Sequence, residues 1–157
     1  MIEIERKFLV LSKAYKAEAF RKYDIIQGFL NSDKERTVRI RLKDNDGFIT
    51  VKGKSSDSGL TRFEWEKKLS KQEAMALLKL CEPGVINKTR YEVKLNKHTF
   101  EVDEFFEDNA GLVIAEVELT SENELFTKPS WLGEEVTGQT KYYNSQLSKH
   151  PFKFWRP

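Results

Sequence analysis

The sequence predicts a mainly β fold of the α+β class, in which eight antiparallel strands form a barrel or a strongly curled sheet with few helices. Three observations predict this class. Apolar and polar residues alternate in eight segments, turn sequences separate several of these segments, and helical patterns are few. The 157 residues suffice for one domain with its own core, and no repeat or Pro/Gly-rich linker divides them. We therefore expect residues 1–157 to form a single domain.

The expected strands are short segments in which every second residue is apolar. Successive side chains of a strand point to opposite faces of the sheet, so each segment has an apolar face and a second face. Asn45-Asp46-Gly47 is a sequence that closes a hairpin between two of them. The expected strands are residues 2–10, 24–31, 36–44, 47–54, 61–69, 86–95, 98–106 and 111–120.

Two longer helices are expected outside the strands. The spacing of apolar residues predicts them over residues 12–22 and 70–80. Ser70 and Glu73 have the spacing of a capping box, which supports a helix start at Ser70. Shorter helices are expected over residues 121–126 and 142–148.

The composition says more about the cellular location of the protein than about its binding partner. The single cysteine, Cys81, excludes a disulfide framework, and neither a membrane-length apolar run nor a signal peptide is visible. We therefore expect a cytoplasmic protein that does not bind a membrane. The 27 Lys and Arg against 25 Asp and Glu give a net charge of +2, which by itself argues neither for nor against nucleic acid.

The second face of the strands carries charges almost exclusively. Glu and Asp, or Lys and Arg, occur two residues apart with the same sign, although like charges on one face repel and add little stability. The pairs are Glu3/Glu5, Glu64/Glu66 and Glu116/Glu118 for the acidic residues, and Arg39/Arg41, Lys52/Lys54 and Lys88/Arg90 for the basic ones.

Two interpretations of this charged face remain open from the residues alone. In the first, the sheet packs its apolar face on helices and exposes the charges to water. In the second, the sheet closes with the charges inward, around a water-filled passage, because isolated charges in a dry core are very costly. The basic half would then suit a phosphate-rich anion, and the carboxylates would suit Mg²⁺ or Mn²⁺ bridging to its oxygens. The second interpretation predicts a metal-dependent polyphosphate site.

Several short motifs, in this order, resemble those of the CYTH family, also called triphosphate tunnel metalloenzymes. The opening E-I-E-R-K is similar to that family's N-terminal E-x-E-x-K motif. Late in the chain, T-K-Y-Y-N, in which Lys141 is the lysine and Asn144 the last residue, is similar to the start of the family's closing helix. Phe29 departs from the family, in which many members have tyrosine. The resemblance extends from Glu3 to about Leu147. The motifs between these ends are R-I-R, V-K-G-K, R-F-E-W-E, K-T-R, E-V-D and A-E-V-E-L.

The resemblance implies an eight-stranded antiparallel tunnel with a charged interior, a divalent metal (Mg²⁺ or Mn²⁺) and a linear triphosphate as substrate. The residues that it assigns to the triphosphate are Lys7, Arg39, Arg41, Lys52, Lys88 and Arg90. Arg62 and Lys141 are further candidates for binding the substrate, at opposite ends of the passage. Those that it assigns to the metal, directly or through water, are Glu3, Glu5, Glu64, Glu66, Asp103, Glu116 and Glu118. Catalysis would rest on Glu5, Lys7, Glu116 and Glu118.

Three functions are compatible with this pattern. The first is an inorganic triphosphatase, in which water attacks a terminal phosphoryl group of tripolyphosphate. The second is a class IV-type adenylyl cyclase, or a thiamine or nucleoside triphosphatase, that uses the same tunnel. The third is a non-catalytic polyphosphate-binding module. The expected partner is a small-molecule triphosphate and not a nucleic acid, and a homodimer is left open.

Overall fold

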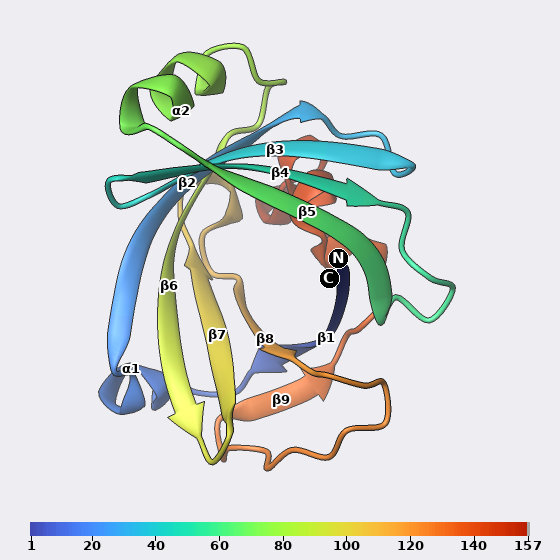
Figure 1. Cartoon of the computed structure of the whole chain (residues 1–157). Coiled ribbons are helices and arrows are strands. Elements are labelled where there is room, and N and C mark those ends of the chain that lie inside the picture. The colour runs from blue at the N-terminus through green and yellow to red at the C-terminus, as the bar shows by residue number, and fades with distance from the viewer. Residues whose placement is uncertain (157) are drawn as a thin grey trace.

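A sheet of nine antiparallel strands surrounds a central space in this computed structural model, which describes residues 1–156 (Figure 1). The neighbouring strands follow the order β5-β4-β3-β2-β6-β7-β8-β1-β9. The strands are β1 Ile2–Val10, β2 Arg21–Asn31, β3 Arg36–Lys43, β4 Asp46–Gly53, β5 Thr61–Leu69, β6 Ile86–Leu95, β7 His98–Phe105, β8 Val113–Glu118 and β9 Leu132–Glu135.

Pairing between the first and fifth strands closes the sheet into a barrel. Residues 2–4 of β1 pair with residues 61–63 of β5, while residues 5–9 of β1 pair with β8. This confirms the prediction of an eight-stranded antiparallel barrel. The ninth strand, β9, pairs with the end of β1 and was not expected, because its four residues, LGEE, are too few to show alternation.

Helix α1 spans only Tyr15–Glu18, so the helix expected over 12–22 is wrong for most of its length. Strand β2 begins at Arg21 instead and pairs along β6, where Arg21 lies opposite Glu92. Local helical spacing over KAYKAEAF therefore competes with pairing to a distant strand. The distant pairing prevails, as is common for weak local propensities.

The other helices follow the sequence more closely. Helix α2 spans Lys71–Leu78, and Ser70 and Glu73 form the expected capping box. Helix α3 spans Asn144–Lys149, within one or two residues of expectation, but residues 121–126 form a turn followed by irregular backbone and not a helix. There the Glu124 carboxylate accepts hydrogen bonds from Thr120 and contacts His98, which favours a turn. Three short 3₁₀ segments span Glu107–Asn109, Thr140–Tyr142 and Phe152–Phe154.

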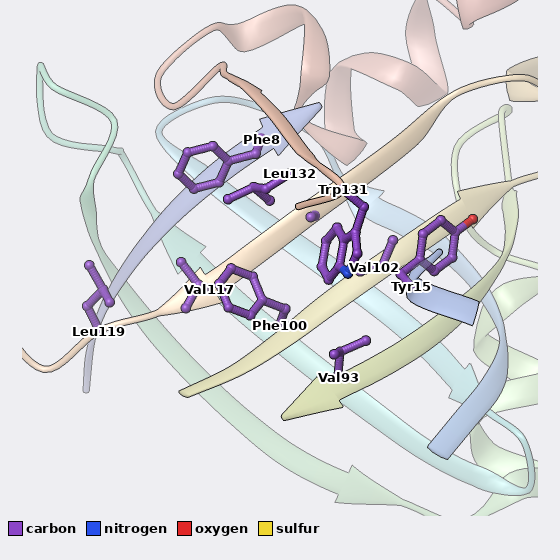
Figure 2. Packing of buried hydrophobic residues seen from close by; sticks show 10 residues of the cluster. Phe8, Tyr15, Val93, Phe100, Val102, Val117, Leu119, Trp131 and Leu132 are labelled. Atoms are coloured by element: carbon purple, nitrogen blue, oxygen red, sulfur yellow. The ribbon is translucent and has the colours of Figure 1, made fainter. Parts of the chain in front are cut away.

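The apolar faces of the strands point outward, and most of them are covered by other segments, whereas Phe63 and Trp65 of β5 stay exposed. On β1, β6, β7 and β8 they contact α1 and the segment that leads into β9, where Trp131 lies against Tyr15 and Phe100 (Figure 2). On β3 and β4 they lie beneath α2, where Ala74 contacts Ile40 and Leu42. Because the outer face is apolar and covered, the charged face is the interior of the barrel.

The C-terminal helical segment closes one end of this interior. In Figure 1 it is drawn in red and lies behind β3, β4 and β5. At this end the inward side chains become apolar and pack around Leu147 of α3, which is fully buried. The inward residues in this cluster are Leu9, Ile86, Phe105, Leu112 and Ile114. Among residues 1–156, no helix is both long enough and apolar enough to cross a membrane.

Candidate functional site

A pocket occupies the centre of the barrel next to the closed end. Its walls come from β1 to β6, from β8, from the β4–β5 loop and from residues 137–145. Alternation places one or two charged residues in it from each of these strands except β2, which contributes Phe29, as expected for a largely charged inward face. Of the residues expected in the site, the pocket is lined by Glu5, Lys7, Arg39, Lys52, Arg62, Lys88, Arg90 and Glu116.

Asp103 binds two of the buried cations. Its Oδ1 accepts from Arg90 Nε at 2.8 Å, and its Oδ2 accepts from Lys88 Nζ at 2.8 Å and from a terminal Arg90 nitrogen at 2.9 Å. Burial alone would raise the pKa of Asp103, but Arg90 and Lys88 outweigh it and hold the pKa well below its usual range. Both oxygens are therefore occupied by cations, and Asp103 orients Lys88 and Arg90 toward the pocket.

Arg39 and Arg41 carry buried donors without acceptors. A terminal nitrogen of each lies near Glu66, at 3.6 Å for Arg39 and 3.4 Å for Arg41, and Arg39 also donates to Thr50 at 3.1 Å. Within residues 1–156, however, the buried Nε of each guanidinium has no hydrogen-bond partner. Since an unpartnered buried donor is costly, these two groups are suited to an anion that is held in the barrel.

Glu5 and Glu116 form an uneven pair of carboxylates. Burial, together with the neighbouring Glu116 and Glu3, raises the pKa of Glu5 well above its usual value. Burial also opposes ionisation of Glu116, but Lys7, whose Nζ lies 3.7 Å away, and Arg90 lower the pKa of Glu116 to about 2. Their surroundings thus disfavour the ionised form of Glu5 and favour that of Glu116. This is typical of an oxygen cluster that lacks a compensating cation.

Glu3 and Glu64 lie beside the same basic residue. Lys52 Nζ is 3.0 Å from Glu3 and 3.3 Å from Glu64, which places both carboxylates on the β1–β5 side of the barrel. Arg62 lines the pocket from β5, and its guanidinium donates to the Gly53 carbonyl at 2.8 and 3.1 Å. The acidic and basic residues of this side therefore alternate across the strands.

Some residues expected in the site lie outside the pocket. Glu118 is opposite Glu5 on the neighbouring strand but is exposed toward the far mouth, beside Glu101. Glu66 contacts Arg39 and Arg41 from β5 without lining the pocket. Lys141 is exposed on the outside, with its Nζ 4.7 Å from the centroid of the Trp155 ring. Within the described residues, no three carboxylate, His or Cys side chains gather closely enough to hold a metal ion as they stand.

The closed end contributes residues that the charge pattern did not indicate. Thr137, Gly138, Tyr143, Asn144 and Ser145 all line the pocket, and they belong to a segment without strand alternation. The charge pattern could not have selected them, although Tyr143 and Asn144 lie within the T-K-Y-Y-N motif. Phe29, the departure from the family's tyrosine, also lines the pocket, so its wall lacks a hydroxyl at that position.

Gln27 was missed despite a visible signal. It is a fully buried amide on β2, and it stands alone among apolar residues in the sequence IIQGFL. A lone polar residue inside an apolar strand has to find a buried partner, and the partner here is Asn144, at 2.7 Å.

Known proteins are similar to this chain in sequence. A model of the CYTH domain matches residues 1–151. A protein of Acetivibrio thermocellus named inorganic triphosphatase is 47% identical over 152 residues, which cover 96% of each chain. A second inorganic triphosphatase, from Nitrosomonas europaea, is 34% identical and covers 94% of this chain and 97% of its own.

Solved structures agree with these matches. The structure of an inorganic triphosphatase superposes with a TM-score of 0.66 at 31% identity and covers 93% of each chain. A Hippeastrum protein at 14% identity, with a TM-score of 0.61 over 76% of this chain and 80% of its own, shares the fold. Because the family match and the relatives extend over nearly the whole chain, we conclude that this chain belongs to the CYTH domain family.

Proposed function

We propose that this chain is a divalent-metal-dependent triphosphatase whose preferred substrate is inorganic tripolyphosphate. The observation that carries the proposal is the central pocket, in which buried cations with unpartnered donors lie beside a carboxylate cluster. The names of the two relatives, both inorganic triphosphatases, support the same substrate. An anion with several charges, and not a neutral ligand, is what such a pocket stabilises.

The basic residues would hold the triphosphate along the pocket. Arg39 offers a planar guanidinium that suits phosphate oxygens, while Lys52 and Lys88 act as compact point charges from β4 and β6. Lys7 and Arg90 lie next to the carboxylates, so they contact the end of the substrate at which the reaction takes place. Their charges stabilise the negative charge that develops on the transferred and leaving phosphate groups.

The carboxylates fit a divalent cation. Burial, together with Glu116 and Glu3, raises the pKa of Glu5, so a cation beside it would stabilise its ionised form, and carboxylate oxygens are the ligands that Mg²⁺ and Mn²⁺ prefer. Glu3, Glu5 and Glu116 would hold the ion, with Glu64 and Glu118 able to act through water. When bound, such an ion neutralises phosphate oxygens and lowers the pKa of a neighbouring water.

The chain's own residues then position the reactants. A water oxygen forms a bond to the terminal phosphorus as the bond to the bridging oxygen breaks, which releases phosphate and pyrophosphate. Glu118 lies next to Glu5 on the side of the open mouth, and burial together with Glu3 raises its pKa. From this position Glu118 would act as the general base that accepts the proton of the attacking water. Lys7 stabilises the charge on the phosphoryl group.

The test is phosphate release from tripolyphosphate, ATP and thiamine triphosphate, measured side by side with Mg²⁺ or Mn²⁺. We expect tripolyphosphate to have the highest kcat/KM and the Glu5→Gln variant to be nearly inactive on it. ATP turnover that yields cyclic AMP would replace the proposal with a cyclase. Tight binding without turnover of any of the three would leave a polyphosphate-binding module.

A further inference from the structure

We infer that Asn144 is a positioning residue, which fixes the Lys88 ammonium group where it can bind the triphosphate. This inference rests on the proposed function. It concerns a residue outside the charge pattern, at the start of helix α3, and it links the C-terminal segment to the chemistry of the pocket.

Lys88 has three N–H donors, and the protein occupies two of them. One donates to Asp103 Oδ2 at 2.8 Å and one to Asn144 Oδ1 at 2.9 Å. The side chain of Lys88 is almost fully buried, and the residue lines the pocket. Two fixed acceptors leave the third donor in one direction, and a fixed donor loses less freedom when a phosphate oxygen binds.

Two donors converge on the amide oxygen of Asn144 and fix its orientation. Gln27 Nε2 donates to the same oxygen at 2.7 Å, from strand β2, which pairs with the strand β6 that carries Lys88. The Lys88 ammonium cannot accept a hydrogen bond, so the atom of Asn144 that faces it has to be the oxygen. Because Gln27 is fully buried, it has little freedom to move away. The amide is therefore held in the one orientation that serves Lys88.

The backbone of Asn144 is equally fixed. The next turn of α3 is closed by hydrogen bonds from Gln146 and Leu147 to the Tyr143 carbonyl, and Leu147 is fully buried in the apolar cluster at the closed end. Gly84 packs its backbone directly against Ser148, where a Cβ at Gly84 would lie 2.0 Å from the Ser148 carbonyl oxygen. The docking of α3 therefore determines where the Asn144 oxygen stands.

The experiment measures the Kd of tripolyphosphate by titration calorimetry without metal, so it does not depend on turnover. Asn144→Ala removes the acceptor, and Asn144→Leu removes it while filling the space. We expect both variants to raise Kd about tenfold, the range expected when a hydrogen bond to a charged group is lost. Lys149→Ala, an exposed residue of the same helix, is the control and should leave Kd unchanged.

A double-mutant cycle with Lys88→Ala separates positioning from a merely structural role. If Asn144 acts through Lys88, Asn144→Ala should change Kd less than about twofold in the Lys88→Ala background. An equal effect in both backgrounds, or no effect in the wild type, would overturn the inference while leaving the proposed function intact. If the wild-type protein bound no tripolyphosphate either without metal or with Mg²⁺, the proposed function would fail, and the inference with it.

Discussion

Asp103 and its two cations form the most buried ionic group of the barrel. Its side chain and that of Lys88 are nearly inaccessible, and both oxygens of the carboxylate are in contact with positive charge. Removing one partner of a buried ion pair leaves a charge uncompensated, and this costs far more than the loss of an exposed pair. The stability of the protein should therefore depend on this single carboxylate.

Asp103→Asn is expected to lower the free energy of unfolding by about 3–5 kcal/mol at neutral pH. The folded pKa of Asp103 lies below the unfolded value, so its contribution is present above about pH 4 and is lost as the pH falls below it. The difference between wild type and variant should therefore shrink in acid, as urea unfolding at pH 7 and pH 3 would show. Asp108→Asn, which breaks an exposed pair with Lys153, is the control and should change little. Equal effects of the two substitutions would contradict the ion-pair account.

Glu5 and Arg39 should separate turnover from binding. Glu5→Gln keeps the shape of the side chain but removes the carboxylate, so we expect kcat for tripolyphosphate to fall about 100-fold or more while Kd changes little. Arg39→Ala removes an anion-binding group and should mainly raise KM, about tenfold. Steady-state kinetics with calorimetric Kd values would distinguish the two. A proportional loss of turnover and binding in Glu5→Gln would count against its catalytic role.

Individual residues of the site were predictable only where they follow a strand period. Glu3, Glu5 and Lys7 alternate along β1, so the sequence placed them on one face, and that face is the interior. Asn144 lies in a segment without such a period and enters the pocket only because α3 docks against a distant cluster. Lys141, next to the same helix, matched a family motif but is exposed on the outside. Sequence patterns therefore indicated the strand residues of the site and not the residues of its closed end.

At the scale of elements, the β4–β5 loop and the turn after β9 meet backbone to backbone. Gly59 and Gly138 both have φ near +80°, and a Cβ at Gly59 would lie 2.3 Å from the Gly138 Cα. Ser55 and Gly59 from one segment, and Thr137 and Gly138 from the other, line the pocket. Only glycine permits this approach, which fixes the pocket wall at this point.

Gly59→Ala is expected to lower the free energy of unfolding by about 2 kcal/mol or more and to raise KM, because both segments have to move apart. Gly111→Ala tests the cost of the left-handed conformation alone. Gly111 has φ +96°, but its added Cβ would meet only the Phe152 ring, at 3.4 Å. We expect a smaller loss of stability there and no change in KM. Urea unfolding and initial rates would measure both, and an effect of Gly59→Ala no larger than that of Gly111→Ala would refute the account of this contact.

Elements were predicted well where the local pattern and the long-range pairing agree. The capping box of α2 satisfies both, and so does the hairpin between β3 and β4, although its turn residues are Asp44 and Asn45, and Asp46 and Gly47 already belong to β4. The helix expected over 12–22 satisfied the local pattern only, and the pairing of β2 with β6 prevailed. The short β9 is stabilised by its neighbour β1 and has little pattern of its own, so it could not have been found from sequence.

For the whole molecule, the arrangement of layers determines the chemistry. The apolar faces are covered from outside by helices and by the segment before β9, and the charges are left to face one another across the interior. The like-charge pairs in the sequence are compatible both with a face exposed to water and with this inward arrangement, and the pairing of β1 with β5 decides for the second. The cytoplasmic location and the lack of a nucleic-acid partner stay predictions. A homodimer stays open.

The central claim is that the interior holds tripolyphosphate among the basic residues with a divalent cation at the carboxylates. A crystal structure with Mn²⁺ and a non-hydrolysable imido analogue of tripolyphosphate, with Mn²⁺ located by anomalous scattering, tests it most directly. The account predicts the analogue in contact with Arg39, Lys52, Lys88 and Arg90, and Mn²⁺ at Glu5 and Glu116. An analogue bound only on the outer surface, or Mn²⁺ bound away from these carboxylates, would contradict it.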